Sequence, residues 1–264
     1  MTAFNYLQLE IDNRNVATLW LNRPERNNAL NADFINELTT AFKQVSSDPK
    51  VRLLVIRSKG KHFCSGGDLK WMQESINLDL TGNLKDAQLL SELFYQLYHL
   101  PKPTLAVVQG AAFGGAVGLV ACCDMAIGAD NASFCLSEVR IGLIPATMSP
   151  FIIRCMGKRA ALSYSLTAKR FNGKRATELG LLQQSCPAEE LSTLTEKWIT
   201  QLLQNSPAAQ VASKQLFAEI GTAEITPELR RYTEEAIAKI RVSKEGQEGL
   251  HAFLEKRSPH WVKQ

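Results

Sequence analysis

Two strand-to-helix junctions with the same glycine-rich build constrain the fold of this chain more than any other feature. HFCSGGDL (62–69) and AAFGGAVG (111–118) each follow an apolar strand pattern, carry adjacent glycines and lead into a helix. Strands that alternate with helices in this way are typical of α/β folds. Glycine also lets the backbone approach a ligand closely, and the first turn of a helix has unpaired N–H groups at its positive end.

The hydrophobic pattern predicts strands and helices in the first part of the chain and helices alone in the last part. A hairpin is expected over 6–11 and 16–21, with further strands over 53–58, 104–109, 124–129 and 133–138. Helices are expected after Asn31, over 89–98, and then over 189–204, 226–242 and 248–256. The segment 72–85 has weak periodicity and is predicted to be a mobile loop or a frayed helix. We expect an α/β core over 1–200 and a helical region over 201–264 that docks on the core or on a neighbour.

Composition excludes several classes of protein. A chain of 264 residues that is 45% hydrophobic can bury a large core, and its net charge of +4 comes from scattered basic residues rather than from a stripe that would bind nucleic acid. No apolar run approaches the ~20 residues of a bilayer span, and the N-terminus has no secretory pattern. The six cysteines lack CxxC spacing, so we expect buried free thiols, no metal site and a cytoplasmic location.

The two glycine loops could supply backbone donors to an oxyanion. Two N–H groups that converge on one point form an oxyanion hole, where loss of a donor typically costs ~3 kcal/mol or more. The alternative is that the glycines only permit close helix packing, and neither loop alone decides between the two. The segment GGAVG does not fit the dinucleotide-binding fingerprint.

An oxyanion hole needs an acid or base beside it, and Glu138 in LSEVRIGLIP (136–145) is the best candidate. Apolar neighbours raise the pKa of a carboxyl group toward a useful value. The alternative for Glu138 is a salt bridge to Arg140 or a helix cap. His62 and His99 are more typical of packing or surface residues, and Asp124 of a hydrogen-bonded structural acid. No Gly-x-Ser-x-Gly elbow is present, which argues against a serine hydrolase.

Four segments together resemble the crotonase, or enoyl-CoA hydratase/isomerase, superfamily: NRPERNNALN (22–31), HFCSGGDL, PKPTLAVVQGAAFGGAVGLVACCDMAIGADNASF (101–134) and SEVRIGLIP (137–145). Their order and spacing match, and the resemblance covers nearly the whole chain. It implies a spiral of repeated ββα turns, a C-terminal helical region used in trimerisation, and a homotrimer or a dimer of trimers. It also implies an acyl-CoA thioester substrate, with coenzyme A as part of the substrate, no separate cofactor, and neither nucleic acid nor membrane as a partner.

The resemblance also implies roles for individual residues. It places the oxyanion-hole amides at Ser65 and Gly115 and the acid–base group at Glu138. Residues expected to bind the substrate are Arg26, Ala29, Gly67, Asp68, Leu69, Gly114, Gly118 and Gly142. The chain departs from the family at one of these positions, because the hydratases carry a second glutamate where this sequence has Gly118.

This departure leaves two reactions open. Glu138 alone could activate water and protonate the α-carbon, or it could move a proton in a 3,2-enoyl-CoA isomerase. FGGAVGLVACCDMAIG with SEVRIGLIPATMSPF resembles the bacterial methylglutaconyl-CoA hydratase branch. We therefore favour hydration of a branched or carboxylated acyl chain, with Gly118 and Ala116 providing room for it. A non-catalytic acyl-CoA-binding or RNA-binding homologue is the third possibility, disfavoured because Glu138 and both glycine loops are present.

Overall fold

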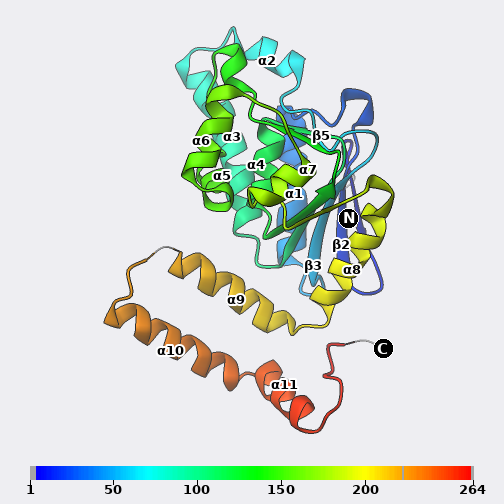
Figure 1. Ribbon diagram of the computed structural model, residues 1–264, viewed down its shortest axis with the longest axis vertical. Helices are drawn as coiled ribbons and strands as arrows, with labels where there is room; N and C mark the ends of the chain where they lie inside the picture. The colour runs from blue at the N-terminus through cyan, green and yellow to red at the C-terminus, as the bar shows by residue number, and fades with distance from the viewer. Residues whose placement is uncertain (1–3, 222, 263–264) are drawn as a thin grey trace. The chain divides into compact units, whose positions relative to one another are not determined.

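Figure 1 shows the computed structural model of the chain, in which residues 4–221 and 223–262 are described. Contacts within the chain define two compact units. The core unit comprises residues 1–100 and 104–195, and the helical unit comprises 101–103 and 196–264. The fold is mixed α/β with a helical C-terminal region, as predicted.

The core unit is built on a six-stranded sheet with the strand order β1-β2-β3-β4-β6-β9. The hairpin of β1 and β2 is antiparallel, and each later strand joins parallel to its neighbour. The strands are β1 (Leu7–Ile11), β2 (Val16–Leu21), β3 (Leu53–Ser58), β4 (Thr104–Val108), β6 (Met125–Ala129) and β9 (Gln184–Cys186). The predicted strands at 6–11, 16–21, 53–58, 104–109 and 124–129 are thus confirmed to within a residue at each end.

A second, three-stranded sheet brings the glycine loops together. It consists of β5 (Ala111–Phe113), β7 (Ser133–Cys135) and β8 (Phe171–Asn172), in the order β5-β7-β8. Cys64 of the first loop pairs with Ala112 in β5, and the Phe113 amide donates to the Cys64 carbonyl at 3.1 Å. The two loops are therefore neighbours in space although almost 50 residues separate them, from Cys64 to Ala112.

The predicted strand over 133–138 is wrong in its second half. The strand β7 ends at Cys135, and Glu138 is the first residue of the short 3₁₀ helix η2 (Glu138–Ile141). Gly142 ends η2 in the left-handed conformation, at φ 77°. The alternation of apolar and polar residues in SFCLSE imitates a strand, but the chain turns before it reaches the glutamate.

Helices of the core unit pack beside one another, and Figure 1 shows α3, α4, α5 and α6 as neighbours. They are α1 (Ala32–Ser47), α2 (Leu69–Ser75), α3 (Leu80–Tyr98), α4 (Gly115–Cys122), α5 (Ser149–Met156), α6 (Lys158–Thr167) and α7 (Gly173–Glu178), with η1 (Pro24–Arg26) and η3 (Ala188–Glu190) between elements. The Asn31 side chain caps α1 by accepting from the Phe34 amide, as expected. Residues 116–122 of α4 are all buried, which explains a sequence that is apolar on every side.

Of the two alternatives predicted for 72–85, the mobile loop is wrong for most of the segment, which is helical on both sides of 76–79. Helix α2 runs through Ser75, and α3 begins at Leu80, where the Asp79 side chain accepts a hydrogen bond from the Gly82 amide at 2.8 Å. Large apolar side chains here are exposed, so no buried stripe marks the helices in the sequence. They are Ile76, Leu78, Leu80 and Leu84.

The C-terminal part of the chain is helical, as predicted. Its helices are α8 (Leu191–Leu203), α9 (Pro207–Ile220), α10 (Pro227–Arg241) and α11 (Lys244–Leu254). Within the helical unit, Glu245 accepts hydrogen bonds from the Ser206 hydroxyl and the Ala208 amide, which ties α11 to the start of α9. Across the described residues, no helix has both the length and the apolar character of a membrane span.

Candidate active site

The first glycine loop is held open by a strand-like pairing with Leu30. The Leu30 amide donates to the Gly66 carbonyl at 2.8 Å, and the Asp68 amide donates to the Leu30 carbonyl at 2.8 Å. Gly67 therefore lies opposite Leu30. No acceptor among the described residues takes the Gly67 N–H, so this amide is available to a ligand.

Ser65 does not fit the predicted role of oxyanion donor. Its amide donates to the Asn27 carbonyl at 3.0 Å, and this hydrogen bond joins the loop to the NRPERNNALN segment. An N–H group already committed to a carbonyl is a poor donor to a second oxygen. In the same loop the amides of Gly66 and Gly67 have no acceptor among the described residues, and the oxyanion role of Ser65 stays a prediction that its bond to Asn27 argues against.

Asp68 fixes the end of the same loop. Its carboxylate caps α2 by accepting from the Lys70 amide and pairs with the Arg23 guanidinium at 2.7 Å, with both side chains largely buried. Burial opposes ionisation, but the hydrogen bonds from Arg23 and the Lys70 amide outweigh it and lower the pKa of Asp68. The residue was predicted to bind substrate, and the contacts that the structure gives it are with its own chain.

The second glycine loop meets the first at the side chain of Leu30. Gly114 has φ 54°, and its amide donates to the Cys135 carbonyl at 2.9 Å. Gly115 then begins α4, and a β-carbon placed on it would lie 3.3 Å from Cδ1 of Leu30. Like Gly67, Gly115 has an N–H with no acceptor in the part of the chain that the structure describes. Leu30 thus contacts both loops, because its backbone lies beside Gly67 and its side chain lies beside Gly115.

Glu138 lies against the second loop. A β-carbon placed on Gly114 would be 3.1 Å from Oε1 of Glu138, so the carboxyl group sits directly beside the glycine turn. Its Oε2 is buried with no hydrogen-bond partner among the described residues, and burial raises the pKa of Glu138. The salt bridge to Arg140 that the sequence left open is not formed, since that guanidinium donates to the Ala168 carbonyl. A buried, unpartnered carboxyl oxygen at this place is typical of a functional group.

The expected room beside Gly118 is filled. A β-carbon there would lie 2.6 Å from Cζ of Phe94 and 2.8 Å from Cβ of Met148. Phe94 is fully buried and its ring packs against Phe151. Ala116 also has no exposed surface. The prediction that these residues open space for an acyl chain is wrong at Gly118, because Phe94 of α3 and Met148, the residue before α5, occupy that space.

The other predicted binding residues have varied environments. Arg26 is exposed at the end of η1, and Ala29 is buried behind it. Leu69 is 83% exposed at the start of α2. Gly142 has φ 77° and open space where a side chain would project. Contact of these residues with a bound coenzyme A stays a prediction.

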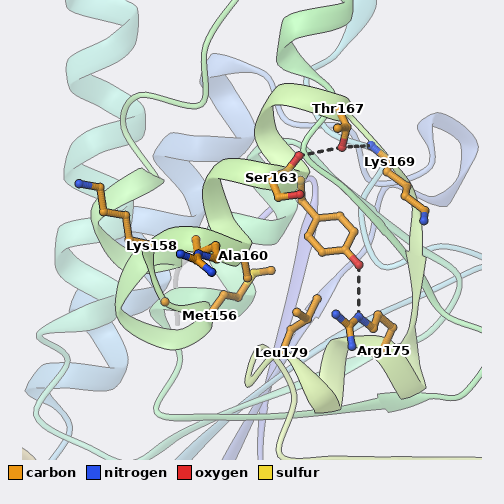
Figure 2. Close-up of a pocket in the computed structure, with 11 residues that line it drawn as sticks. Met156, Lys158, Ala160, Ser163, Thr167, Lys169, Arg175 and Leu179 are labelled. Carbon is orange, nitrogen blue, oxygen red and sulfur yellow. Dashed lines mark hydrogen bonds between the residues drawn. The ribbon is translucent and has the colours of Figure 1, made fainter.

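Two cavities of the core unit differ in their distance from the glycine loops, because only the second is lined by residues of both loops, Ser65 and Phe113. The first, of about 820 Å³, is lined by residues of α6, of α7 and of the segment between them, including Lys158, Lys169 and Arg175 (Figure 2). The second, of about 610 Å³, is lined by residues that include Lys61, His62 and Ser65. Neither is lined by Glu138, Gly114 or Gly115, the residues that meet at the second glycine loop.

Two residues that shape the candidate site, Leu30 and Phe94, were not predicted from the sequence. Leu30 is in the NRPERNNALN motif, but an apolar side chain gives no sign that it contacts both loops. Phe94 is on the predicted apolar face of α3, yet its contact with Gly118 depends on how α3 and α4 pack. The only available signal was the absence of a side chain at Gly118, which implies that a neighbouring group fills the space.

Comparisons with known proteins find chains that are similar to this one over most of its length. The family model described as Enoyl-CoA hydratase/isomerase matches residues 12–264. The structure of an enoyl-CoA hydratase from Shewanella pealeana is 42% identical with a TM-score of 0.94, covering 98% of this chain and 96% of that one. Enoyl-CoA hydratase AFT6-1 from Alternaria alternata is 40% identical over 74% of this chain and 64% of its own length. The trans-2-decenoyl-[acyl-carrier-protein] isomerase of Streptococcus mutans is 31% identical over 98% of both chains.

Proposed function

The chain belongs to the enoyl-CoA hydratase/isomerase family, and on that premise we propose that it is an enoyl-CoA hydratase that works with a single carboxyl group, Glu138. One observation carries the proposal. The Glu138 carboxyl group lies beside the Gly114–Gly115 turn with a buried, unpartnered oxygen, and the amides of Gly115 and Gly67, which both adjoin Leu30, have no acceptor within the described chain. An acid–base group next to free N–H donors suits the formation of an enolate from a thioester.

The proposed reaction assigns the oxyanion donors to Gly67 and Gly115. The thioester carbonyl oxygen accepts both N–H groups. Glu138 takes a proton from water, the hydroxide oxygen bonds to C3, and the electron pair of the C2–C3 double bond moves toward the thioester oxygen as an enolate. The enolate then collapses, and C2 receives the proton from Glu138. Water is added in full, and the glutamate returns to its starting state.

The acyl group that we propose is branched or carboxylated, similar to 3-methylglutaconyl. Because the space at Gly118 is filled, room for it must lie elsewhere. The turn that follows Glu138 supports a location there, since Gly142 has open space around it and its neighbours Ile141 and Leu143 are 58% and 55% exposed. Apolar side chains at an acyl site would be covered by substrate.

A 3,2-enoyl-CoA isomerase is the second candidate, and the packing at Gly118 favours it. Phe94 and Met148 form an apolar wall where a second acid would help to orient water. An isomerase needs no water, because one carboxylate removes a proton from C2 of a 3-enoyl thioester and delivers it to C4. The relative from Streptococcus mutans is an isomerase by name.

A panel of thioesters separates these reactions. We would assay 3-methylglutaconyl-CoA and crotonyl-CoA for water addition and 3-hexenoyl-CoA for double-bond migration, with wild type and Glu138→Gln. The variant should lose at least about a hundredfold in kcat/KM, as expected for a general acid–base group. Glu234→Gln, which removes an exposed helix carboxylate, is the matched control and should act like wild type. A Glu138→Gln enzyme within about tenfold of wild type would refute the role of Glu138.

The assembly also belongs to the proposal. We propose a homotrimer or a dimer of trimers formed through the helical unit, with the acyl-CoA as substrate and no separate cofactor. Large apolar side chains that are exposed in this unit support it, including Phe217 at 74%, Ile225 at 83% and Phe253 at 81%. Analytical ultracentrifugation would give a mass of three or six chains, and a monomer would contradict the proposal.

A further inference from the structure

The carbonyl oxygen of Ala168 connects the two halves of the candidate active site. It accepts a hydrogen bond from Nη2 of Arg140 at 2.7 Å and one from the Cys135 thiol at 3.2 Å. Arg140 is in η2, two residues after Glu138, and the carbonyl of Cys135 accepts the Gly114 amide at 2.9 Å. The turn that carries the acid and the turn that carries the oxyanion donor are thus fastened to one atom.

The end of α6 holds that atom in place. Ala168 is 1% exposed and has φ 46°, a conformation that non-glycine residues seldom adopt. The Thr167 hydroxyl donates to the Ser163 carbonyl at 2.7 Å and accepts from the Lys169 amide at 3.3 Å, and Figure 2 shows both bonds around the helix end. These bonds brace both flanks of Ala168, and its carbonyl is left to β7 and η2.

From this arrangement we propose that Arg140 and Cys135 are positioning residues that set the geometry of Glu138 against the glycine turn. The inference rests on the proposed role of Glu138. A 3₁₀ helix of four residues has little stability of its own, so an outside anchor decides where its first side chain lies. The bond from the charged guanidinium is the stronger of the two, because an ionised donor forms a better hydrogen bond than a thiol.

The hydrogen bond from Arg140 to the Ala168 carbonyl opposes the tendency of the buried Glu138 carboxyl group to move toward water. Burial raises the pKa of Glu138, and no side chain among the described residues donates to its Oε2. Since Arg140 bonds to the Ala168 carbonyl and not to the carboxylate, it holds the acid in place without neutralising it. Loss of Arg140 should therefore let η2 shift and Glu138 gain water, which would lower its pKa toward the ordinary value of 4.5.

The test compares Arg140→Ala and Arg140→Lys with Arg154→Ala, measured by kcat, KM, pH profile and thermal midpoint. Arg154 is a matched control, because its Nη1 also donates to a backbone carbonyl, that of Pro150, at 3.0 Å.

With crotonyl-CoA and 3-methylglutaconyl-CoA, Arg140→Ala should lower kcat by about ten- to a hundredfold, the cost of a misplaced acid, with KM within about twofold. The acidic limb of its pH profile should move to lower pH. Arg140→Lys should recover part of kcat, and Arg154→Ala should leave kcat and the limb unchanged.

Cys135→Ala offers a second, smaller perturbation of the same atom and should lower kcat in the same direction by less. The proposal is overturned if Arg140→Ala lowers the thermal midpoint while kcat and the acidic limb stay at the wild-type values. That result, together with a strong loss in Glu138→Gln, would remove only the positioning role. If Glu138→Gln itself retains turnover, the proposed function fails whatever Arg140→Ala does.

Discussion

The two glycine loops look alike in the sequence and differ in what their glycines do. The first glycine of each pair has a positive φ, and a β-carbon on it would lie 3.1 Å from a neighbouring oxygen. For Gly66 that oxygen is the Phe113 carbonyl, and for Gly114 it is Oε1 of Glu138. A β-carbon on Gly67 would meet only the flexible end of Met72, at 3.4 Å from Sδ. The loops therefore share their backbone geometry and differ in the group that the first glycine faces, which is the candidate acid only in the second loop.

The largest effect should come from exchanging these glycines for alanine. Gly114→Ala forces a side chain into the left-handed region and displaces Glu138, so we expect kcat/KM to fall at least about a hundredfold. Gly67→Ala keeps the N–H and makes an ordinary contact, so kcat/KM should stay within about tenfold of wild type. Steady-state kinetics on both variants make the comparison, with circular dichroism to verify folding. Equal losses would show that the close contact of Gly114 with Glu138 makes no special contribution.

Gly118→Ala should lower the stability of the folded chain. Its β-carbon would lie inside contact distance of Phe94, and overpacking of this kind should lower the free energy of unfolding by about 2–3 kcal/mol. Urea unfolding measures the loss. The double variant Gly118→Ala with Phe94→Leu should recover part of it, since leucine leaves the ring positions empty. Absence of any recovery would mean that the ring is not what excludes the side chain.

Asp68→Asn tests how the first loop is fixed. The substitution removes the charge that pairs with Arg23 and should lower the free energy of unfolding by about 1–2 kcal/mol near neutral pH. The pKa of Asp68 is lowered by folding, so its contribution is complete above the unfolded value of about 3.8 and disappears as the pH falls through the folded pKa. Unfolding curves of wild type and variant should converge in acid. A constant difference down to the lowest pH would contradict the ionic origin.

The smallest effect concerns the stability of Glu138→Gln. Because folding raises the pKa of Glu138, the folded state binds the proton more tightly, and wild type loses stability as the pH rises from the unfolded value through the folded one. Glutamine avoids this cost, so the variant should melt slightly higher at neutral pH, on the order of 1–3 °C, with no difference in acid. Differential scanning calorimetry at two pH values decides, and a lower midpoint for the variant at neutral pH would contradict a desolvated carboxyl group.

Reading of the sequence located most of the core strands because each is a short apolar run bounded by turn residues. It failed at Glu138, where SFCLSE alternates as a strand does but the chain turns at Leu136 and enters η2. It also failed over 72–85, where exposed leucines hide the helical period. Both errors arise where local pattern and tertiary environment disagree.

Motif and chemistry pointed to components of the candidate site, but they did not indicate which of them lie together. Gly115 and Glu138 were found from motif and chemistry, and the structure places the Glu138 carboxyl beside Gly114, the residue before Gly115. The argument against Ser65 and for Gly67 depends on the hydrogen bond from the Ser65 amide to the Asn27 carbonyl, a backbone contact that no side-chain pattern encodes. Likewise, the filling of Gly118 by Phe94 depends on the distance between α3 and α4, and composition carries no information about that distance.

The contact between Gly118 and Phe94 also limits the routes by which this chain could change. One nucleotide separates a glycine codon from a glutamate codon, so an acid at position 118 is always a single mutation away. Such a mutant would appear with its carboxylate against a buried aromatic ring and Met148, and it would be lost before it gave any benefit. Both Phe94 and Met148 would have to give way to a side chain at position 118, since its β-carbon would lie 2.6 Å from Cζ of the ring and 2.8 Å from Cβ of the methionine. Packing therefore opposes a second acid at this position as long as these two neighbours are in place.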